Sequence, residues 1–309
     1  MTVPFTLAGT AKPSQYRITP SPVVIKAGTK SAAIAVQPAD NGINEDDKTV
    51  TVSMGVPANA VQGRTTESTV TIVDADPAPA VSFASGSSRG DEKTSPVRLE
   101  VALSAPSGRP VTVEYAATGG SAIKGKDYAL QGSVLTFAPG ETKKTIDIDI
   151  MNHNVYDDNK TLEVSLKGPK NAVLGSATKR TYTIINTTPM PSVGFLHPDS
   201  SGDEKTSPAR LEVALSAPSG KPVTVEYAAT GGTAVPGTNY VLKDGTLTFA
   251  PGETVKTIEV RVKDDDVNTD DRTFEVSLKN PRNATLGSTA LHTYTILDAD
   301  PAPTVAFAS

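Results

Sequence analysis

The stretch RLEVALSAPSG at residues 98–108 decides the fold, because the chain contains it twice. It returns unchanged at residues 210–220, which is 112 residues further along. In its first half, the apolar Leu99, Val101 and Leu103 alternate with polar or small residues, which is the period of a β-strand with one buried face. Its second half carries Pro and Gly, which favour turns. The stretch therefore predicts a strand followed by a tight turn, used in at least two copies.

The same spacing organises almost the whole chain. The segment GDEKTSP at residues 90–96 recurs at 202–208, and Asp74-Ala75-Asp76-Pro77 recurs at 298–301. A period of this kind indicates a repeat protein. In the first copy Met1 lies opposite Val113, so we expect that copy to lack its first two strands. The expected bounds are 1–79 for a partial domain, 80–191 and 192–303 for two complete domains, and 304–309 for the first strand of a following repeat.

Each complete copy predicts a β-sandwich. In the second copy we expect seven strands, near residues 81–84, 97–104, 110–117, 133–138, 143–151, 160–167 and 178–185. No stretch has the pattern of an amphipathic helix. About 110 residues with seven alternating strands are typical of the immunoglobulin-like fold. The fold class is therefore predicted to be all-β, with tandem seven-stranded antiparallel sandwiches.

The composition excludes several classes of function. The 309 residues include no Cys and no Trp, and the net charge is −5, so a disulfide framework, a thiolate metal site and a nucleic-acid partner are not expected. No apolar run approaches the roughly 20 residues that cross a bilayer, so membrane insertion is not expected either. No catalytic motif such as a P-loop appears, and we expect no enzyme activity. His153, His197 and His292 have no partners at ligand spacing and are expected at the surface or at sheet edges.

An acidic cluster in the third copy is the main candidate for chemistry. Residues 264–266 are all Asp, and Asp270 and Asp271 follow before Arg272 brings the first basic charge. So many carboxylates are either fully solvated or hold a hard cation. The second copy has Asn-His-Asn at the matching residues 152–154, and the first copy has Asp-Asn-Gly at 40–42. The copies therefore differ at the one place where a cation would bind.

These motifs together resemble the Calx-beta family. The third copy has Asn-Tyr at residues 239–240, a Pro-Gly-Glu turn at 251–253, the acidic run that leads into TFEVSL, then NATLG at 283–287 and YTILDAD at 294–300. The resemblance extends over the whole chain and is weaker in the first copy. It implies an immunoglobulin-like sandwich that, in some members, binds Ca²⁺ at one end. Ca²⁺ takes six to eight oxygen ligands, which suits converging carboxylates.

The resemblance also implies a set of Ca²⁺ ligands, named here in this chain. In the third copy they are Glu204, Asn239, Asp264, Asp265, Asp266, Asp270, Asp298 and Asp300, with Asp271 as a further candidate. Asn239 departs from the usual Asp and keeps only a carbonyl oxygen. A weaker set lies in the first copy, at Asp40, Asp46, Asp47, Asp74 and Asp76. In the second copy Asn186 and Thr188 replace the acids of the last strand, so tight binding is not expected there.

The function that follows is a structural or adhesive rod segment of an extracellular or cell-surface protein, bacterial in origin, with Ca²⁺ stiffening selected domains and joints. The expected partners are neighbouring repeats of the chain, other copies of it through strand exchange, and a surface ligand. One alternative is a head-to-tail filament in which residues 304–309 enter the next chain. Another is a non-catalytic or carbohydrate-binding module of a secreted enzyme, which the absence of Trp disfavours.

Overall fold

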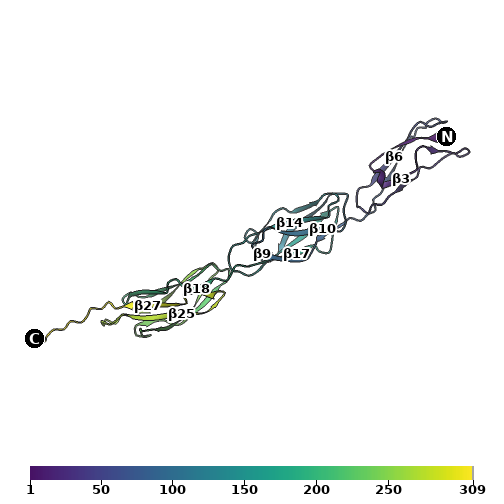
Figure 1. The fold of residues 1–309 in the computed structure, drawn as a ribbon. Helices are drawn as coiled ribbons and strands as arrows, with labels where there is room; N and C mark the ends of the chain where they lie inside the picture. The colour runs from purple at the N-terminus through teal and green to yellow at the C-terminus, as the bar shows by residue number, and fades with distance from the viewer. Residues whose placement is uncertain (308–309) are drawn as a thin grey trace. The chain divides into compact units, whose positions relative to one another are not determined.

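The computed structural model describes residues 1–307, and its regular secondary structure is almost entirely β-strand (Figure 1). Among these residues the only helical element is a 3₁₀ turn, η1, at Pro13–Gln15. No helix in the described part has the length and apolar character needed to cross a bilayer. The prediction of an all-β class is confirmed.

The chain divides into two compact units. The first contains Met1–Arg89, Thr94–Ile150 and Thr161–Thr183, and the second contains Gly90–Lys93, Met151–Lys160 and the chain from Ile184 onward. The loop between residues 151 and 160 therefore belongs to the same unit as the third repeat.

The second repeat folds as two five-stranded sheets, ordered β12-β14-β10-β8-β16 and β13-β11-β15-β17-β9. The strands are β8 (Ala80–Phe83), β9 (Ser87–Asp91), β10 (Val97–Leu103), β11 (Val111–Gly119), β12 (Tyr128–Leu130), β13 (Val134–Phe137), β14 (Lys143–Ile150), β15 (Lys160–Lys170), β16 (Val173–Leu174) and β17 (Lys179–Ile185). Burial alternates along β10, where Leu99 and Val101 are fully buried. The core therefore lies between the two sheets, as the period of two requires.

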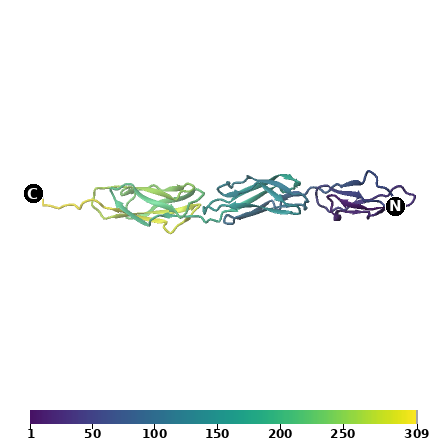
Figure 2. The ribbon, with the colours of Figure 1, turned by 90° about the horizontal axis from the view of Figure 1, so that it is seen from above.

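The third repeat has the same topology, with sheets ordered β22-β24-β20-β18-β26 and β19-β27-β25-β21-β23. Its strands are β18 (Ser192–Phe195), β19 (Asp199–Asp203), β20 (Ala209–Leu215), β21 (Val223–Gly232), β22 (Tyr240–Val241), β23 (Gly245–Phe249), β24 (Val255–Val262), β25 (Arg272–Arg282), β26 (Thr285–Leu286) and β27 (Leu291–Leu297). Figure 2 shows these strands from above, still grouped together. In the core, Phe274 stacks between Tyr240 and Tyr294, with ring centroids 4.6 and 5.1 Å apart.

The first repeat has shorter strands and smaller sheets, β2-β6-β7, β3-β5 and β1-β4. Its strands are β1 (Thr2–Val3), β2 (Phe5–Ala8), β3 (Tyr16–Ile18), β4 (Val23–Val24), β5 (Val36–Pro38), β6 (Lys48–Met54) and β7 (Glu67–Ile72). Few of its side chains are fully buried. Val50 is one of them.

Each of the seven strands expected in the second repeat has a counterpart within a few residues of its predicted bounds. The structure adds β9, β12 and β16, which the prediction did not include. For residues 304–307, expected to form the first strand of a further repeat, the structure assigns no strand, and residues 308–309 of that prediction lie outside the described residues.

The expectation for His292 is wrong. This side chain is only 3% exposed, its Nε2 lies 2.8 Å from Ser200 Oγ, and its Nδ1 lies 2.8 Å from the His197 carbonyl oxygen. Two polar partners, one on the neighbouring strand β19 and one just before it, satisfy both ring nitrogens of the buried imidazole.

Candidate metal centre in the third repeat

Three segments that are far apart in sequence carry acids to one end of the third repeat. Asp264 to Asp266 follow the end of β24, Glu204 comes directly after β19, and Asp298 and Asp300 follow β27. Because β19 and β27 are parallel neighbours, with Asp203 opposite Leu297, their carboxyl ends coincide. The fold therefore places these loops together at one end of the repeat.

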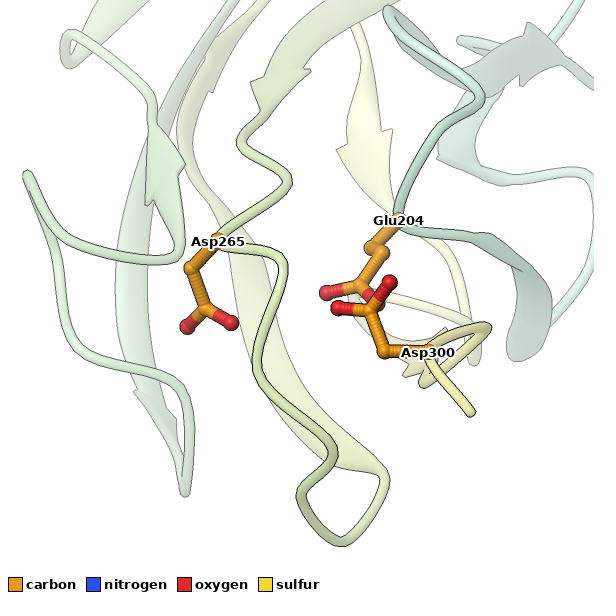
Figure 3. Close-up of side chains that lie close together, drawn as sticks. All are labelled: Glu204, Asp265 and Asp300. Carbon is orange, nitrogen blue, oxygen red and sulfur yellow. The ribbon is translucent and has the colours of Figure 1, made fainter. Parts of the chain in front are cut away.

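The carboxylates form two groups that share Asp300. One group is Glu204, Asp265 and Asp300, and the other is Asp264, Asp266 and Asp300; within each group one oxygen from every residue lies within 4.8 Å of the others. Figure 3 shows the Glu204 and Asp300 carboxylates next to one another, with Asp265 on the neighbouring loop. Oxygens that bind one Ca²⁺ at 2.3–2.6 Å lie at most about 5 Å apart. Both groups fit that limit.

Electrostatics at the centre favour an added cation. Glu204 is 7% exposed and the Asp300 side chain 6%, and the buried Oδ2 of Asp300 has no hydrogen-bond partner. Lys205 brings a cationic side chain to this pair, with its Nζ 2.9 Å from Asp300 Oδ1. Burial, and then the nearby Asp298 and Asp300, raise the pKa of Glu204. Two buried carboxylates and an unsatisfied oxygen are the donor set of a hard divalent cation, so the residues fit Ca²⁺.

The loop after β24 is shaped by its own side chains. Asp266 adopts a left-handed φ of 56°, and Asp265 Oδ1 accepts a hydrogen bond from the Val267 amide at 3.1 Å. Asn268 Nδ2 donates to Asp298 Oδ2 at 3.0 Å and to the Asp300 carbonyl at 2.9 Å. These bonds tie the acidic loop to the segment after β27. Asn268 was not among the predicted residues. The first repeat has an Asn at the matching position, Asn44, and this identity could have drawn attention to it.

Asp298 serves as part of this framework. Its Oδ2 accepts the Thr269 amide at 3.0 Å and its Oδ1 accepts the Asp300 amide at 3.3 Å. The hydrogen bond from Thr269 is the main reason that the pKa of Asp298 is lowered. A carboxylate held ionised by backbone donors keeps negative charge beside the centre.

The remaining predicted residues lie at the rim. Asn239 Oδ1 accepts hydrogen bonds from the Val235 amide at 2.9 Å and from Arg272 Nη1 at 3.3 Å. Asp271 Oδ1 accepts the Asp298 amide at 3.0 Å. A small hollow of about 10 Å³ is bordered by Glu204, Asn239, Asp265, Asp270 and Asp298. Asn239, Asp270, Asp271 and Asp298 are thus neighbours of the two carboxylate groups without belonging to either.

In the second repeat, residues that donate hydrogen bonds stand where the third repeat has Asp298 and Asp300. Glu92, the counterpart of Glu204, is 5% exposed, and its carboxylate accepts bonds from Thr188 Oγ1 at 2.8 Å, the Thr187 amide at 3.2 Å and Asn186 Nδ2 at 3.1 Å. A carboxylate saturated by protein donors needs no cation. The counterparts of the acidic run, Asn152 and Asn154, bond to each other.

The first repeat is intermediate. Asp40, Asp46, Asp74 and Asp76 line an open hollow of about 380 Å³ together with Glu45 and Lys48. Asp47 Oδ1 accepts the Asp74 amide at 3.0 Å, which repeats the Asp271–Asp298 bond. Burial, followed by Asp40 and Asp74, raises the pKa of Asp76. Among the described residues, only the third repeat brings three carboxylates within 4.8 Å.

Comparison with known proteins gives a consistent family. The chain is 29% identical over 286 residues to Extracellular matrix protein 3 of Lytechinus variegatus, covering 87% of this chain and 9% of that protein. It is 27% identical over 191 residues to Sodium/calcium exchanger 1 of Bos taurus, covering 56% of this chain and 20% of that protein. The chain therefore spans only a small part of these relatives. Among solved structures, the apo-form Calx CBD1 domain is 29% identical, with all of that domain and 36% of this chain covered and a TM-score of 0.35.

The model of the Calx-beta domain matches residues 2–76, 74–188 and 186–300, which together account for nearly the entire sequence. Its three matches follow the repeat found in the sequence. The chain belongs to the Calx-beta family, as three Calx-beta domains in tandem.

Proposed function

We propose that the chain is a structural segment of an extracellular matrix or adhesion protein, in which Ca²⁺ bound to the third repeat stabilises that repeat. The convergence of Glu204, Asp265 and Asp300 around an unsatisfied buried oxygen carries this proposal. Supporting it, one relative is an extracellular matrix protein, and another is the Adhesion G-protein coupled receptor V1 of Danio rerio, at 24% identity over 94% of this chain and 5% of that receptor.

Some residues of the centre would supply Ca²⁺ ligands, and others would hold the loops in place. Glu204 and Asp300 would supply buried oxygens, and Asp264, Asp265 and Asp266 would supply oxygens from an exposed loop. Asp298, held by Asn268 and Thr269, would keep the two segments aligned and add charge. Bound Ca²⁺ would neutralise the repulsion among these acids. An ion that binds only the folded repeat stabilises it. A free Ca²⁺ concentration of 100 times Kd would add about 2.7 kcal/mol to the free energy of unfolding.

The first repeat would bind Ca²⁺ more weakly, through Asp40, Asp74 and Asp76, and the second repeat would not respond. The repeat bounds 1–79, 80–191 and 192–303 are part of the same proposal. In this scheme one scaffold is used with and without a cation, depending on a few side chains at one end.

Thermal unfolding in millimolar Ca²⁺ and in chelator, combined with calorimetric titration, tests the proposal. We expect Ca²⁺ to raise the midpoint of the third repeat, and Asp265→Asn and Asp300→Asn to remove that increase. Asp244→Asn is the matched control, since Asp244 is an exposed acid of the same repeat outside the centre. Indifference of the unsubstituted chain to Ca²⁺ would refute the calcium part of the function.

A second candidate function rests on exposed apolar residues near the end of the chain. Val305 and Phe307 are fully exposed, although their counterparts Val81 and Phe83 are buried in β8. The first repeat has an apolar hollow of about 290 Å³, lined by Val3, Phe5, Val23, Ile25, Ile34 and Val52 among others. In this candidate, residues 304–309 of one copy enter the hollow of another and form a filament. Light scattering of the chain and of Phe307→Asp decides it, because a filament subunit would lose its self-association.

A further inference from the structure

A short loop of one repeat contacts a turn of the next in the same way at two places. We call residues 44–46, 156–158 and 268–270 the docking loops, and residues 107–109 and 219–221 the basic turns. The Gly108 amide donates to the Asn44 carbonyl at 2.9 Å, and 112 residues later the Gly220 amide donates to the Tyr156 carbonyl at 2.8 Å. At both places the loop and the turn form an isolated parallel bridge, Asn44 with Ser107 and Tyr156 with Ser219. Each contact lies inside one of the two compact units.

The two glycines are needed for this approach. A Cβ on Gly108 would lie 2.7 Å from the Cβ of Glu45, and a Cβ on Gly220 would lie 2.8 Å from Cγ of Asp157. The Cβ of Glu45 is fixed to its backbone, so a side chain at residue 108 requires the loop to move, and a side chain at residue 220 requires at least the Asp157 side chain to shift. The preceding Ser107 and Ser219 are each 2% exposed, so the residue before each glycine is buried.

At both places the residue after the glycine is basic and forms an ion pair with an acid of the docking loop. Arg109 Nε lies 2.8 Å from Asp46 Oδ1, and Arg109 Nη2 donates to the Glu45 carbonyl at 2.5 Å. In the other contact Lys221 forms an ion pair with Asp158 and also lies over the Tyr156 ring, 5.6 Å from its centroid. Arg109 in one contact is replaced by Lys221 in the other, and in both a basic side chain pairs with the last acid of the docking loop.

The third docking loop has the same structure and carries no basic turn among the described residues. Asn268 Nδ2 binds Asp298 and the Asp300 carbonyl, as Asn44 Nδ2 binds Asp74 and the Asp76 carbonyl. Asn44 is half-buried, whereas Asn268 is exposed. Asp270 occupies the position of Asp46 and Asp158 and is exposed.

We propose that the docking loop is a repeat-to-repeat binding site for a Ser-Gly-basic turn, and that residues 268–270 form an open site of this kind. Its partner is the corresponding turn of another Calx-beta repeat. Asp270, which the sequence suggests as a Ca²⁺ ligand, then pairs with a Lys or Arg of that repeat. The site does not depend on the calcium proposal, because its contacts are backbone hydrogen bonds and ion pairs.

Disulfide trapping tests the existing contact between residues 156 and 219. The chain has no Cys, so Tyr156→Cys and Ser219→Cys are the only thiols, and bridge partners lie within disulfide reach. We expect intramolecular oxidation in chelator, slowed at least tenfold by Gly220→Ala or by Asp158→Lys. Adding Lys221→Asp to Asp158→Lys should restore the rate. Gly86→Ala, at a glycine with open space around it, is the matched control, and the sheet pair Thr51→Cys with Thr69→Cys reports on general oxidation.

The open site requires a chain with a further repeat. Adding residues 198–309 after Ser309 continues the 112-residue register and supplies a new basic turn. We expect Asn268→Cys to be trapped by the Cys that replaces the added Ser219, at a rate within threefold of Asn44→Cys with Ser107→Cys. Asp270→Lys should slow trapping tenfold, and Lys221→Asp in the added repeat should restore it. No trapping, or trapping that ignores residue 270, would overturn the open site.

Calcium titration separates this inference from the proposed function. Asp270→Asn should leave the Ca²⁺ affinity within twofold of the unsubstituted chain, whereas Asp265→Asn should lower it at least tenfold. If Asp270→Asn lowers the affinity as much as Asp265→Asn, then Asp270 is a ligand and the inference fails. If the chain binds no Ca²⁺ while trapping behaves as expected, only the proposed function fails.

Discussion

Thr188 Oγ1 donates a 2.8 Å hydrogen bond to Glu92 Oε1, at the position where the third repeat sets Asp300 beside Glu204. In the second repeat a hydrogen-bond donor therefore satisfies the buried Glu92 carboxylate, whereas in the third repeat a second acid lies beside the buried Glu204 carboxylate. A buried carboxylate needs either, because leaving it without a partner costs about 1–3 kcal/mol or more. The exchange of Thr188 for Asp300 is one of several at this end of the two copies, together with Asn152, His153 and Asn154 in place of the three acids at residues 264–266.

Thr188→Asp should destabilise the second repeat in chelator by about 1–3 kcal/mol, since it removes a donor and places a second acid against buried Glu92. Hydrogen exchange of peptides from β15 and β17, read by mass spectrometry, reports on this repeat alone. Thr188→Ser keeps the hydroxyl and should leave exchange unchanged. Equal exchange in the Asp and Ser variants would show that the hydrogen bond contributes nothing.

Asp300→Thr should have the reverse effect in the third repeat. The hydroxyl can donate to Glu204, so the repeat should gain stability in chelator, while Ca²⁺ should no longer raise its melting midpoint. The loss of the ion pair between the buried Asp300 carboxylate and half-exposed Lys205 offsets part of this gain. Calorimetric scans with and without Ca²⁺ give both quantities. A variant that still responds to Ca²⁺ would exclude Asp300 as a ligand.

The fold could be predicted because its signals are local. Alternation along β10 and β14 and the 112-residue period define the strands without knowledge of their neighbours. The strands β9, β12 and β16 were missed for the opposite reason. The sequence of β9, Ser-Ser-Arg-Gly-Asp, has no apolar alternation, and such strands form because a longer neighbour supplies hydrogen bonds.

The candidate site could be predicted only in part. The acidic residues came from repeat comparison and from the family resemblance, and whether they bind Ca²⁺ stays a prediction. The sequence could not show that Asp300 belongs to both carboxylate groups, or that Asp46 and Asp158 face basic turns. It also could not show that His292 is buried with its two ring nitrogens against Ser200 and the His197 carbonyl. These facts depend on which loops meet in space, and a repeat period carries no such information.

The third repeat should lose stability in acid as Glu253 becomes protonated. Its carboxylate accepts the Ala250 amide at 2.7 Å and contacts Lys256, and these bonds hold its pKa below the ordinary value of 4.5. An acid with a lowered pKa stabilises the fold above its unfolded pKa, and that contribution is lost as the pH falls through the folded pKa. Glu253→Gln should flatten the stability profile below about pH 4.5. Denaturation at a series of pH values measures it.

The same turn in the second repeat supplies a control, because the pKa of Glu141 is lowered by the Ala138 amide and Lys144. Glu141→Gln should change the acid profile of that repeat and leave the third repeat unchanged. If either substitution alters both repeats equally, the effect comes from net charge and not from the local bonds.

Gly232→Ala should be among the most damaging single changes in the third repeat. Gly232 has a φ of +104°, and a Cβ there would lie 2.1 Å from the Thr273 carbonyl oxygen, so both the backbone conformation and the packing forbid a side chain. The expected loss is about 3–5 kcal/mol, the range of severe single substitutions. Gly237→Ala is the matched control in the same repeat, because its φ of +83° is similar but nothing lies within 4 Å. It should cost about 1 kcal/mol, from backbone strain alone. Urea unfolding of both variants separates the two costs, and equal losses would show that strain, and not the close approach to Thr273, makes this glycine necessary.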